Sequence, residues 1–224
     1  MGELVRQGTI VEHRSDFLAQ TRGDGVVVLS APKRGGAVSL ADVLAQRRSV
    51  RKSAKGPLTL AAVSQLLWAA QGVTGRDEQR TAPSAGALYP LELYLVAGAV
   101  TGLEAGVYRY EPKRHRLLFH LKGDPRGELA DAALEQEWVA EAPSVLVIGA
   151  VYRRSERKYG RRAQRYVHME VGHVAQNVYL QAVALDLGTV MVGAFHDRRL
   201  AQVLRLPGDV EPLGVMPIGK RRDD

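Results

Sequence analysis

A group of side chains suited to a phosphate monoester lies at residues 47–51, which read Arg-Arg-Ser-Val-Arg. Guanidinium groups form paired, charge-assisted hydrogen bonds with phosphate oxygens, and a serine hydroxyl adds a further donor. Taken alone, such a group is more often a solvated surface, because charged residues are seldom buried. Two other segments of the chain favour a binding site over a solvated surface. The small residues at 83–86 (Pro-Ser-Ala-Gly) would let a flat ring approach the backbone, and Lys220 would supply a further cation.

Two other phosphate-binding patterns fail. Residues 214–220 match most of the phosphate loop of nucleoside triphosphatases, but Arg221 stands where a Ser or Thr must bind magnesium. The GxGxxG fingerprint of dinucleotide-binding proteins is absent as well. The sequence therefore predicts neither a nucleoside triphosphatase nor a dinucleotide-binding fold.

Metal binding is not expected either. Glu170 and His173 have the spacing of the Glu-x-x-His pair in di-iron bundles, but such a site needs two copies of the pair and further carboxylates. His168 and His173 are five residues apart, so they diverge around a helix and do not match the zinc motif HExxH. Since the chain has no cysteine, it has no thiolate zinc site, iron–sulfur cluster or cysteine nucleophile. Any redox chemistry must come from a bound cofactor.

The composition is that of one compact domain, because the 224 residues are 46% hydrophobic. No run approaches the roughly 18 apolar residues of a membrane span, and the first residues lack the apolar run of a signal peptide. We therefore expect a cytoplasmic protein with no membrane partner. The net charge of +7 would suit nucleic acid or an anionic ligand. In the most basic segment, 153–165, only tyrosines interleave, and no zinc-finger or RNA-recognition signature accompanies it, so no nucleic-acid partner is expected.

Helical and strand patterns supply the framework for these residues. After a lead-in segment, residues 1–36, with alternation around Thr9 to His13 and an apolar run at 26–29, Ser39 caps a predicted helix. Thr59 caps a second helix that ends at Gly72. The prolines and glycine of 81–90 exclude a regular helix there. Strands are predicted at 91–96, 107–110, 117–121, 144–151, 190–192 and 213–218.

The longest predicted helix runs from about Gln164 to Leu187, and Gly188 closes it. Its apolar residues recur every three or four positions, which is typical of a helix packed on a core. Shorter helices are predicted from Asp124 to Leu134 and from a cap at Asp197 to Leu204. The order of elements favours one α/β or α+β domain with the long helix at its centre.

Four motifs in this order resemble the nitroreductase-like FMN flavoprotein superfamily: Arg-Arg-Ser-Val-Arg at 47–51, Leu-Trp-Ala-Ala-Gln-Gly-Val-Thr-Gly at 67–75, Pro-Ser-Ala-Gly-Ala-Leu-Tyr-Pro-Leu-Glu at 83–92 and Gly-His-Val-Ala-Gln-Asn at 172–177. Within this superfamily the chain is similar to the SagB-type dehydrogenase branch, whose best-known members oxidise azolines to azoles in ribosomal peptides. The resemblance covers most of the chain, from about Leu40 to Lys220. The first motif alone is a weak signal, whereas four in the right order are a strong one.

The resemblance implies an α+β fold with helices around a mixed β-sheet, an FMN-binding domain at residues 37–224, and an intertwined homodimer with two FMN sites at its interface. It places the FMN phosphate and ribityl chain on Arg47, Arg48, Ser49 and Arg51, with Lys220 nearby. It places the flavin ring against Pro83, Ser84, Ala85 and Gly86 of the other subunit and against the backbone of Gly193 and Ala194, with Gln71 as a further candidate.

Lys158 and Tyr159 match the Lys-Tyr pair that azoline oxidases of this branch use near the flavin. When hydride leaves for flavin N5, a base must remove a proton, and a lysine partly desolvated among other cations can be that base. Lys158 is equally a member of a basic surface stretch, so both interpretations stay open. Ala87 departs from the broader nitroreductases, many of which place there an Asn that hydrogen-bonds the flavin. Their ring contacts are therefore not transferred to this chain.

The leading hypothesis is an FMN-dependent oxidoreductase that moves hydride between a small or peptide substrate and flavin N5. One alternative is an NAD(P)H-dependent nitroreductase or quinone reductase, in which NAD(P)H as electron donor would rapidly bleach the flavin. The second alternative is a non-catalytic flavin- or anion-binding protein, whose flavin neither reductant nor azoline would change. The sequence names no substrate, electron donor or partner cyclodehydratase.

Overall fold

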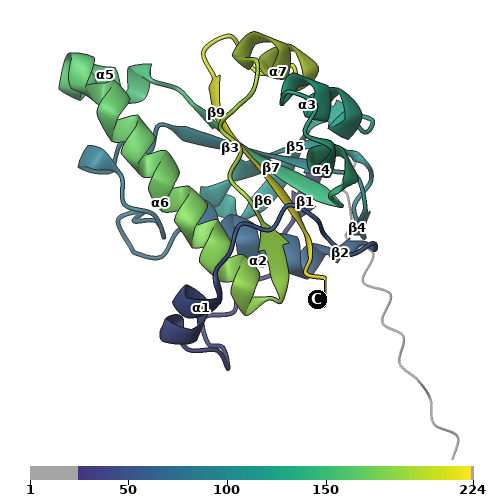
Figure 1. Cartoon of the computed structure of the whole chain (residues 1–224). Coiled ribbons are helices and arrows are strands. Elements are labelled where there is room, and N and C mark those ends of the chain that lie inside the picture. The colour runs from purple at the N-terminus through teal and green to yellow at the C-terminus, as the bar shows by residue number, and fades with distance from the viewer. Residues whose placement is uncertain (1–24, 223–224) are drawn as a thin grey trace, which may run out of the picture.

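A computed structural model describes residues 25–222, so the alternation expected around Thr9 to His13 lies outside the described residues. The strands are β1 Val26–Val28, β2 Leu58–Thr59, β3 Leu91–Ala97, β4 Val100–Thr101, β5 Gly106–Glu111, β6 Arg116–Lys122, β7 Ser144–Ala150, β8 Leu187–Thr189 and β9 Glu211–Lys220. The α-helices are α1 Leu40–Gln46, α2 Leu60–Gln71, α3 Arg126–Ala132, α4 Glu137–Glu141, α5 Arg153–Tyr159, α6 Ala163–Ala184 and α7 Asp197–Val203. Figure 1 shows the sheet at the centre with α6 crossing in front of it.

The main sheet has seven strands in the order β1-β6-β5-β3-β7-β9-β8. Every pair of neighbouring strands in it is antiparallel. The mixed sheet expected from the resemblance is therefore wrong for this sheet. The parallel pairing lies elsewhere, in the short two-stranded sheet of β2 and β4. The α+β class is correct, because an antiparallel sheet packs against helices that do not alternate strictly with its strands.

Both faces of the main sheet are buried. Successive residues of its central strands face two different apolar clusters. In β3, Leu93 and Leu95 face the cluster that includes α2 and α6, whereas Tyr94 and Val96 face the cluster that includes α3, α4 and α7. In β7 all residues are buried, as expected for a strand covered on both faces. Successive side chains of a strand point to opposite faces, so two helical layers can pack on one sheet.

Two helices beside the candidate site, α1 and α2, begin where the sequence predicts. The N–H of Asp42 donates to Ser39 Oγ at 3.1 Å, and the N–H of Ala62 donates to Thr59 Oγ1 at 3.1 Å. Both side chains thus satisfy an N–H that has no partner within its helix. α2 ends with Gly72 as its C-cap, as predicted.

The end of α6 differs from the prediction. The helix stops at Ala184 because Asp186 turns the chain with a φ of 56°, and residues 187–189 then pair with β9 as an edge strand. Gly188 is thus no helix cap. A Cβ on it would lie 2.6 Å from Val50 Cγ1, so glycine allows that segment to pack closely. The strand expected at 190–192 is reduced to one bridge between Val192 and Val215.

Two shorter helices also differ from the prediction. The helix expected from 124 to 134 is divided into α3 and α4, because Leu134 and Glu135 have a φ of 58°, outside the right-handed helical region. α7 begins at Asp197 after an N-cap at His196, so Asp197 is its first residue and not its cap. The basic segment 153–165 forms α5, a short 3-10 turn and the start of α6.

Candidate functional site

The loop at residues 81–90 is held in a strained conformation beside α6. Gly86, Ala87 and Tyr89 have φ values of 63°, 54° and 46°. This left-handed region costs a residue with a side chain roughly 1–2 kcal/mol. Ser84 fixes the turn twice: its carbonyl accepts the N–H of Ala87 at 3.0 Å, and its Oγ accepts the N–H of Tyr89 at 3.0 Å. The small residues predicted to contact a flat ring thus form one preshaped turn.

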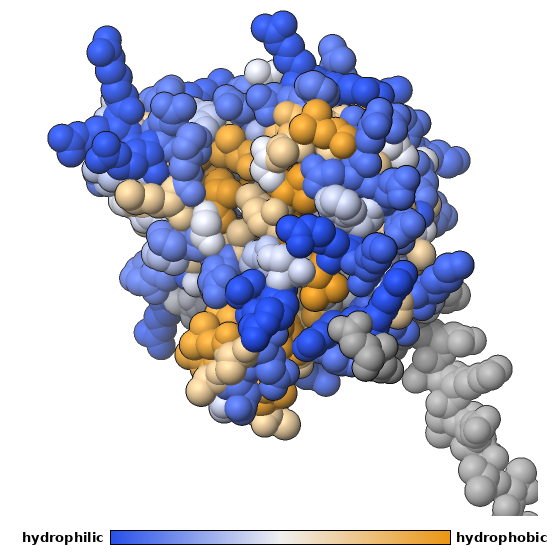
Figure 2. Space-filling view, viewed as in Figure 1, coloured by the Kyte–Doolittle hydropathy of each residue, from blue (hydrophilic) through white to orange (hydrophobic). Residues whose placement is uncertain are grey.

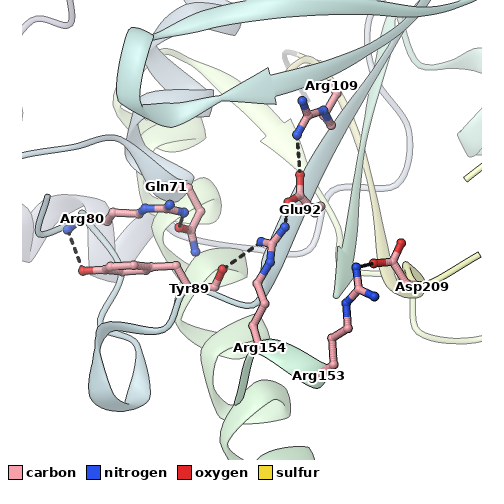
Figure 3. Close-up of polar contacts among 8 residues, drawn as sticks. All are labelled: Gln71, Arg80, Tyr89, Glu92, Arg109, Arg153, Arg154 and Asp209. Atoms are coloured by element: carbon pink, nitrogen blue, oxygen red, sulfur yellow. Dashed lines mark hydrogen bonds and ion pairs between the residues drawn. The ribbon is translucent and has the colours of Figure 1, made fainter. Parts of the chain in front are cut away.

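A buried polar network supports this turn. Glu170 of α6 and Gln71 at the end of α2 are 2% and 0% exposed. Gln71 Nε2 donates to Glu170 Oε1 at 3.3 Å. Arg80 Nη1 donates to Gln71 Oε1 at 2.7 Å (Figure 3). Burial raises the pKa of the Glu170 carboxyl above its ordinary value, while hydrogen bonds from Ser84 and Gln71 act to lower it. The Gln71 amide is therefore committed to protein partners on both of its atoms.

The predicted catalytic pair lies over the same turn, on α5. A Cβ built on Gly86 would lie 2.9 Å from Lys158 Nζ and 2.7 Å from the Tyr159 hydroxyl. Lys158 is exposed, and its Nζ lies 5.5 Å from the centroid of the Tyr159 ring. Arg154 holds α5 to the loop, because its Nη1 donates to the Tyr89 carbonyl at 3.2 Å. The candidate base and the predicted ring contact are thus neighbours within one chain.

The predicted phosphate-binding residues lie after α1, against Tyr179 of α6. The Arg47 guanidinium carbon lies 5.3 Å from the centroid of the Tyr179 ring, and Ser49 Oγ lies 3.3 Å from its hydroxyl. Arg48 turns back and donates to two backbone carbonyls at the end of α1, at 2.9 and 2.8 Å. The exposed Arg51 side chain forms no hydrogen bond or ion pair with the described residues. Arg48 is thus partly used in capping, whereas Arg51 is available to a ligand.

Tyr179 also connects these cations to the segment after β8. Its hydroxyl accepts the N–H of Met191 at 2.7 Å. Gly193 and Ala194 follow and are both exposed, and a Cβ built on Gly193 would meet no atom within 4 Å. The predicted backbone contact is therefore open at Gly193, whereas the Ala194 carbonyl already accepts Gln136 Nε2 at 3.1 Å.

Lys220 reaches the same region through the end of β9. Its carbonyl accepts the N–H of Ala54 at 2.9 Å, and the N–H of Val50 donates to the carbonyl of Thr189 in β8 at the same distance. These two bonds fix residues 50–54 along the β8 and β9 edge. The structure therefore brings Lys220 close to the segment that carries the predicted phosphate cations.

The two groups of predicted site residues lie toward opposite ends of α6. Glu170, at the strained turn, and Tyr179, at the cations, are nine residues apart, which is about 13.5 Å at 1.5 Å per residue. Figure 1 shows α5 at one end of α6 and α1 near the other. Each end therefore presents half of the predicted site.

Other kinds of site find no support in the part of the chain that the structure describes. Residues 25–222 hold no group of three or more His, Asp or Glu side chains placed to bind a metal ion. Glu170, one half of the Glu-x-x-His spacing, is enclosed in the polar network. None of the described helices is both long and apolar enough to cross a membrane.

Sequence reasoning missed two residues of this arrangement. Tyr179 follows the 172–177 motif by two positions, but only the fold shows that it contacts Arg47 and Ser49. Arg80 lies in a charged loop that reads as solvated surface. In the structure its guanidinium carbon lies 4.2 Å from the centroid of the Tyr89 ring, and burial lowers the pKa of Arg80. Neither residue gives a signal in local spacing.

Residues 44–220 match the family model described as the Nitroreductase family. A provisionally named nitroreductase of Methanocaldococcus jannaschii is 52% identical over 184 residues, covering 82% of this chain and 92% of that protein. The trifolitoxin-processing protein TfxB of Rhizobium leguminosarum bv. trifolii is 32% identical over 128 residues, covering 51% of this chain and 32% of that protein.

Solved structures share the fold. A provisionally named nitroreductase from Ralstonia eutropha superposes with a TM-score of 0.78 at 30% identity, covering 89% of this chain and 91% of that one. A chain of the E. coli microcin synthetase McbBCD complex gives 0.69 at 24% identity, covering 88% and 78%. NADPH:FMN oxidoreductase from Vibrio harveyi gives 0.60 at 21% identity, covering 82% and 69%. The last two likenesses concern the fold alone.

The antiparallel sheet with helices on both faces, together with the family match, defines an α+β oxidoreductase. The chain belongs to the nitroreductase family, whose members are generally FMN-dependent.

Proposed function

We propose that the chain is an FMN-dependent oxidoreductase of the SagB-type dehydrogenase branch, which transfers hydride between flavin N5 and a small or peptide substrate. The arrangement around α6 carries this proposal. One end presents phosphate-type donors, and the other presents a strained turn of small residues with a lysine and a tyrosine over it. These two sets match the two ends of one flavin mononucleotide, a terminal phosphate and a flat ring.

The donor set beside α1 suits the FMN phosphate. Arg51 has an uncommitted guanidinium, Arg47 and Ser49 are held by Tyr179, and Lys220 adds an exposed ammonium. The open backbone at Gly193 leaves room for the edge of a ring. When bound, FMN supplies the hydride acceptor or donor that protein side chains lack.

Lys158 and Tyr159 handle the proton in this proposal. Oxidation of an azoline removes a hydride from one atom and a proton from its neighbour, so a base must hold that proton. Lys158 Nζ and the Tyr159 hydroxyl lie at the strained turn that is proposed to contact the ring. An unprotonated Lys158 amine would take the proton, and Tyr159 would orient it by hydrogen bonding.

We further propose a homodimer in which each FMN is shared between subunits. Val38, Leu40 and Leu44 are 45%, 66% and 51% exposed, although they are apolar. They lie around α1 beside a hollow of about 400 Å³ that Trp68 and Leu180 help to line, and Figure 2 shows apolar side chains gathered at this end of the molecule. Contiguous exposed apolar surface marks an interaction site. A second chain docked there would bring its own strained turn and Lys158 toward the phosphate cations of the first.

The names of relatives favour different members of the oxidoreductase class. One relative is named for trifolitoxin processing, and one fold neighbour belongs to a microcin synthetase complex with truncated pro-MccB17 bound, which favours a peptide substrate. An NAD(P)H-dependent reductase is the second candidate, favoured by the provisional name of the Methanocaldococcus relative and by the NADPH:FMN oxidoreductase neighbour. Anaerobic mixing separates them: azoline peptides reduce the flavin of an azoline oxidase, whereas NAD(P)H rapidly bleaches a reductase.

The cofactor is tested by mass spectrometry of the small molecule released from purified protein. Stoichiometric FMN is expected, because the cations suit a terminal phosphate and the dinucleotide fingerprint is absent. Stoichiometric FAD, or no flavin after incubation with FMN, contradicts the proposal. Light scattering that shows only a monomer of 24.4 kDa contradicts the dimer, whose unfolding should also depend on protein concentration.

Sharing of the site is tested by mixing two defective proteins. The first carries Arg47→Ala with Arg51→Ala and should not hold FMN, and the second carries Lys158→Ala and should hold FMN without turnover. If each site takes its cations from one chain and Lys158 from the other, a mixed dimer has one site with no defect and regains up to about half of the wild-type turnover per dimer. If each site uses one chain only, every site in the mixture keeps a defect and no activity returns.

A further inference from the structure

A small charged cleft lies between Arg80, strands β3 and β5, and Arg154 of α5. Its volume is about 160 Å³. Its charged lining residues are Arg80, Glu92, Arg109, Glu111, Lys113 and Arg154. Figure 3 shows Arg80 and Gln71 on one side, and Glu92 with Arg109 and Arg154 on the other. The cleft therefore has four cationic side chains and two carboxylates.

Both carboxylates are already engaged. Glu92, whose side chain is 11% exposed, accepts Arg109 Nη1 at 3.3 Å and also pairs with Arg154 Nη2, so one carboxylate serves two guanidinium groups. Glu111 pairs with Arg114 at the β5–β6 turn and with Arg116 in β6, and neither arginine lines the cleft. Lys113 pairs with Glu78, which does not line the cleft, at 2.6 Å. Positive charge therefore stays incompletely neutralised at the three arginines of the cleft, because Arg109 and Arg154 share one carboxylate and Arg80 donates to a neutral amide.

Arg80 is the cation with the poorest neutralisation. Its Nη1 donates to the neutral Gln71 amide, and its guanidinium group packs over the ring of Tyr89. Its Nε is buried and has no hydrogen-bond acceptor among the described residues. Burial lowers the pKa of Arg80, which means that the charged form lacks full compensation. An anion in the cleft would provide that compensation.

The cleft lies close to the proposed reaction site. Arg154 and Lys158 are four residues apart on α5 and share a face, at a rise of about 6 Å. Arg154 contacts the Tyr89 carbonyl, and Lys158 reaches Gly86 in the same loop. A substrate at Lys158 could therefore extend a substituent into the cleft.

We propose that this cleft binds a carboxylate group of the substrate, which makes carboxylate-bearing compounds the preferred substrate class. The inference rests on the proposed function, because it takes Lys158 as the reaction site. A volume of about 160 Å³ is below the roughly 300–1,000 Å³ of sites for whole drug-sized ligands, so it suits one substituent. A planar carboxylate also matches the paired donors of a guanidinium group.

Direct binding is tested by NMR of the arginine Nε–Hε groups in labelled holoprotein, at constant ionic strength. Peaks of Arg109 and Arg154 are assigned by their loss in R109Q and R154Q, and the peak of Arg199 by its loss in R199Q. Sodium acetate should shift the first two peaks and leave that of Arg199, an exposed arginine paired with Asp131 on the α3–α7 side. Acetamide, the neutral analogue, should shift none. Acetate that moves no peak, or moves Arg199 equally, overturns the proposal. So does inorganic phosphate that shifts the cleft peaks when acetate does not.

Substrate preference is tested with 4-nitrobenzoate and 4-nitrobenzamide, which share size and a reducible nitro group, with NAD(P)H as the electron donor. R109Q should lower kcat/KM for the carboxylate by about threefold to tenfold. This is the expected effect of losing one charge-assisted hydrogen bond, reduced by solvent screening because Arg109 is partly exposed. It should leave the amide unaffected and keep the FMN content, and R199Q should change neither substrate. An equal loss for both compounds overturns the inference. If neither compound is turned over, the reductase candidate has failed, flavin reduction by azoline peptides still tests the proposed function, and the NMR result decides whether the cleft binds carboxylates.

Discussion

The two ends of α6 are built in different ways. Beside Tyr179, the cations are half-buried or exposed, and Arg51 has no partner among the described residues. Beside Glu170, a nearly fully buried carboxylate, an amide and a partly buried arginine hold a strained turn. The first end has exposed donors left over for a ligand, whereas at the second end the Gln71 amide is committed to protein partners and the turn has a fixed shape. The affinity for FMN should therefore depend mainly on the first end. The geometry of the reaction should depend on the second.

The largest effect is expected from Lys158→Ala, which tests whether the fixed end performs chemistry. A positioned base contributes on the order of 10²- to 10⁴-fold to a rate, so substrate-dependent flavin reduction should fall by that factor while FMN stays bound. The measurement is anaerobic flavin reduction by azoline peptides, with nitroarenes and quinones tested as oxidants of the reduced flavin. Arg157→Ala is the matched control, because it removes one exposed charge from the same helix. If Lys158→Ala and Tyr159→Phe both reduce flavin at the wild-type rate, the pair is surface charge and the general reductase becomes the better assignment.

Arg51→Ala tests whether the open end supplies the affinity. Each charge-assisted hydrogen bond lost should cost about 1.5–3 kcal/mol, which is roughly tenfold or more in FMN affinity. The unfolding of the apoprotein should change little, since the exposed Arg51 side chain forms no hydrogen bond or ion pair with the described residues. Fluorescence titration with FMN measures the affinity, and Lys52→Ala, also exposed, is the control. Equal affinities for both variants would place the phosphate elsewhere.

The buried carboxyl at the fixed end should make stability depend on pH. The pKa of Glu170 is raised above its ordinary 4.5, so the folded protein binds this proton more tightly than the unfolded chain does. Its contribution to stability is therefore fully present below about pH 4.5 and is lost as pH rises through the folded pKa, by about 1.4 kcal/mol per unit of elevation.

Glu170→Gln should remove that part of the pH dependence and leave a flatter profile in urea unfolding measured from pH 4.5 to 8. The exposed Glu104→Gln should keep the wild-type profile. Identical profiles for the two variants and the wild type would show that Glu170 is not titrating in an enclosed site.

The smallest effects are expected from a pair of glycine substitutions. Gly86→Ala adds a side chain at a φ of 63° and within 3 Å of Lys158 Nζ and the Tyr159 hydroxyl, so it should cost about 1 kcal/mol and lower turnover by displacing both groups. Gly172→Ala, on α6 with no atom within 4 Å of the added Cβ, should instead stabilise by about 0.5–1 kcal/mol. Thermal unfolding and turnover distinguish them. Unchanged turnover in Gly86→Ala would show that the catalytic pair does not depend on this turn.

Local patterns in the sequence determined the starts of α1 and α2, several strands and the family. Ser39 and Thr59 cap their helices as predicted, because capping depends on residues only three positions apart. The sequence also placed strands β5, β6 and β7, since a short run of β-prone or apolar residues is a local property. The four ordered motifs led to the family that the comparisons confirm.

Only the tertiary structure decided where the predicted residues meet. Ser49 and Tyr179 are 130 positions apart, and Gln71 and Glu170 are 99 apart, so no local spacing connects either pair. The end of α6 was likewise set by pairing of residues 187–189 with β9, which overrode the glycine signal at 188. Contacts of this kind form because the fold brings distant surfaces together and satisfies their buried polar groups, and the free energy that selects them is absent from any short window of sequence.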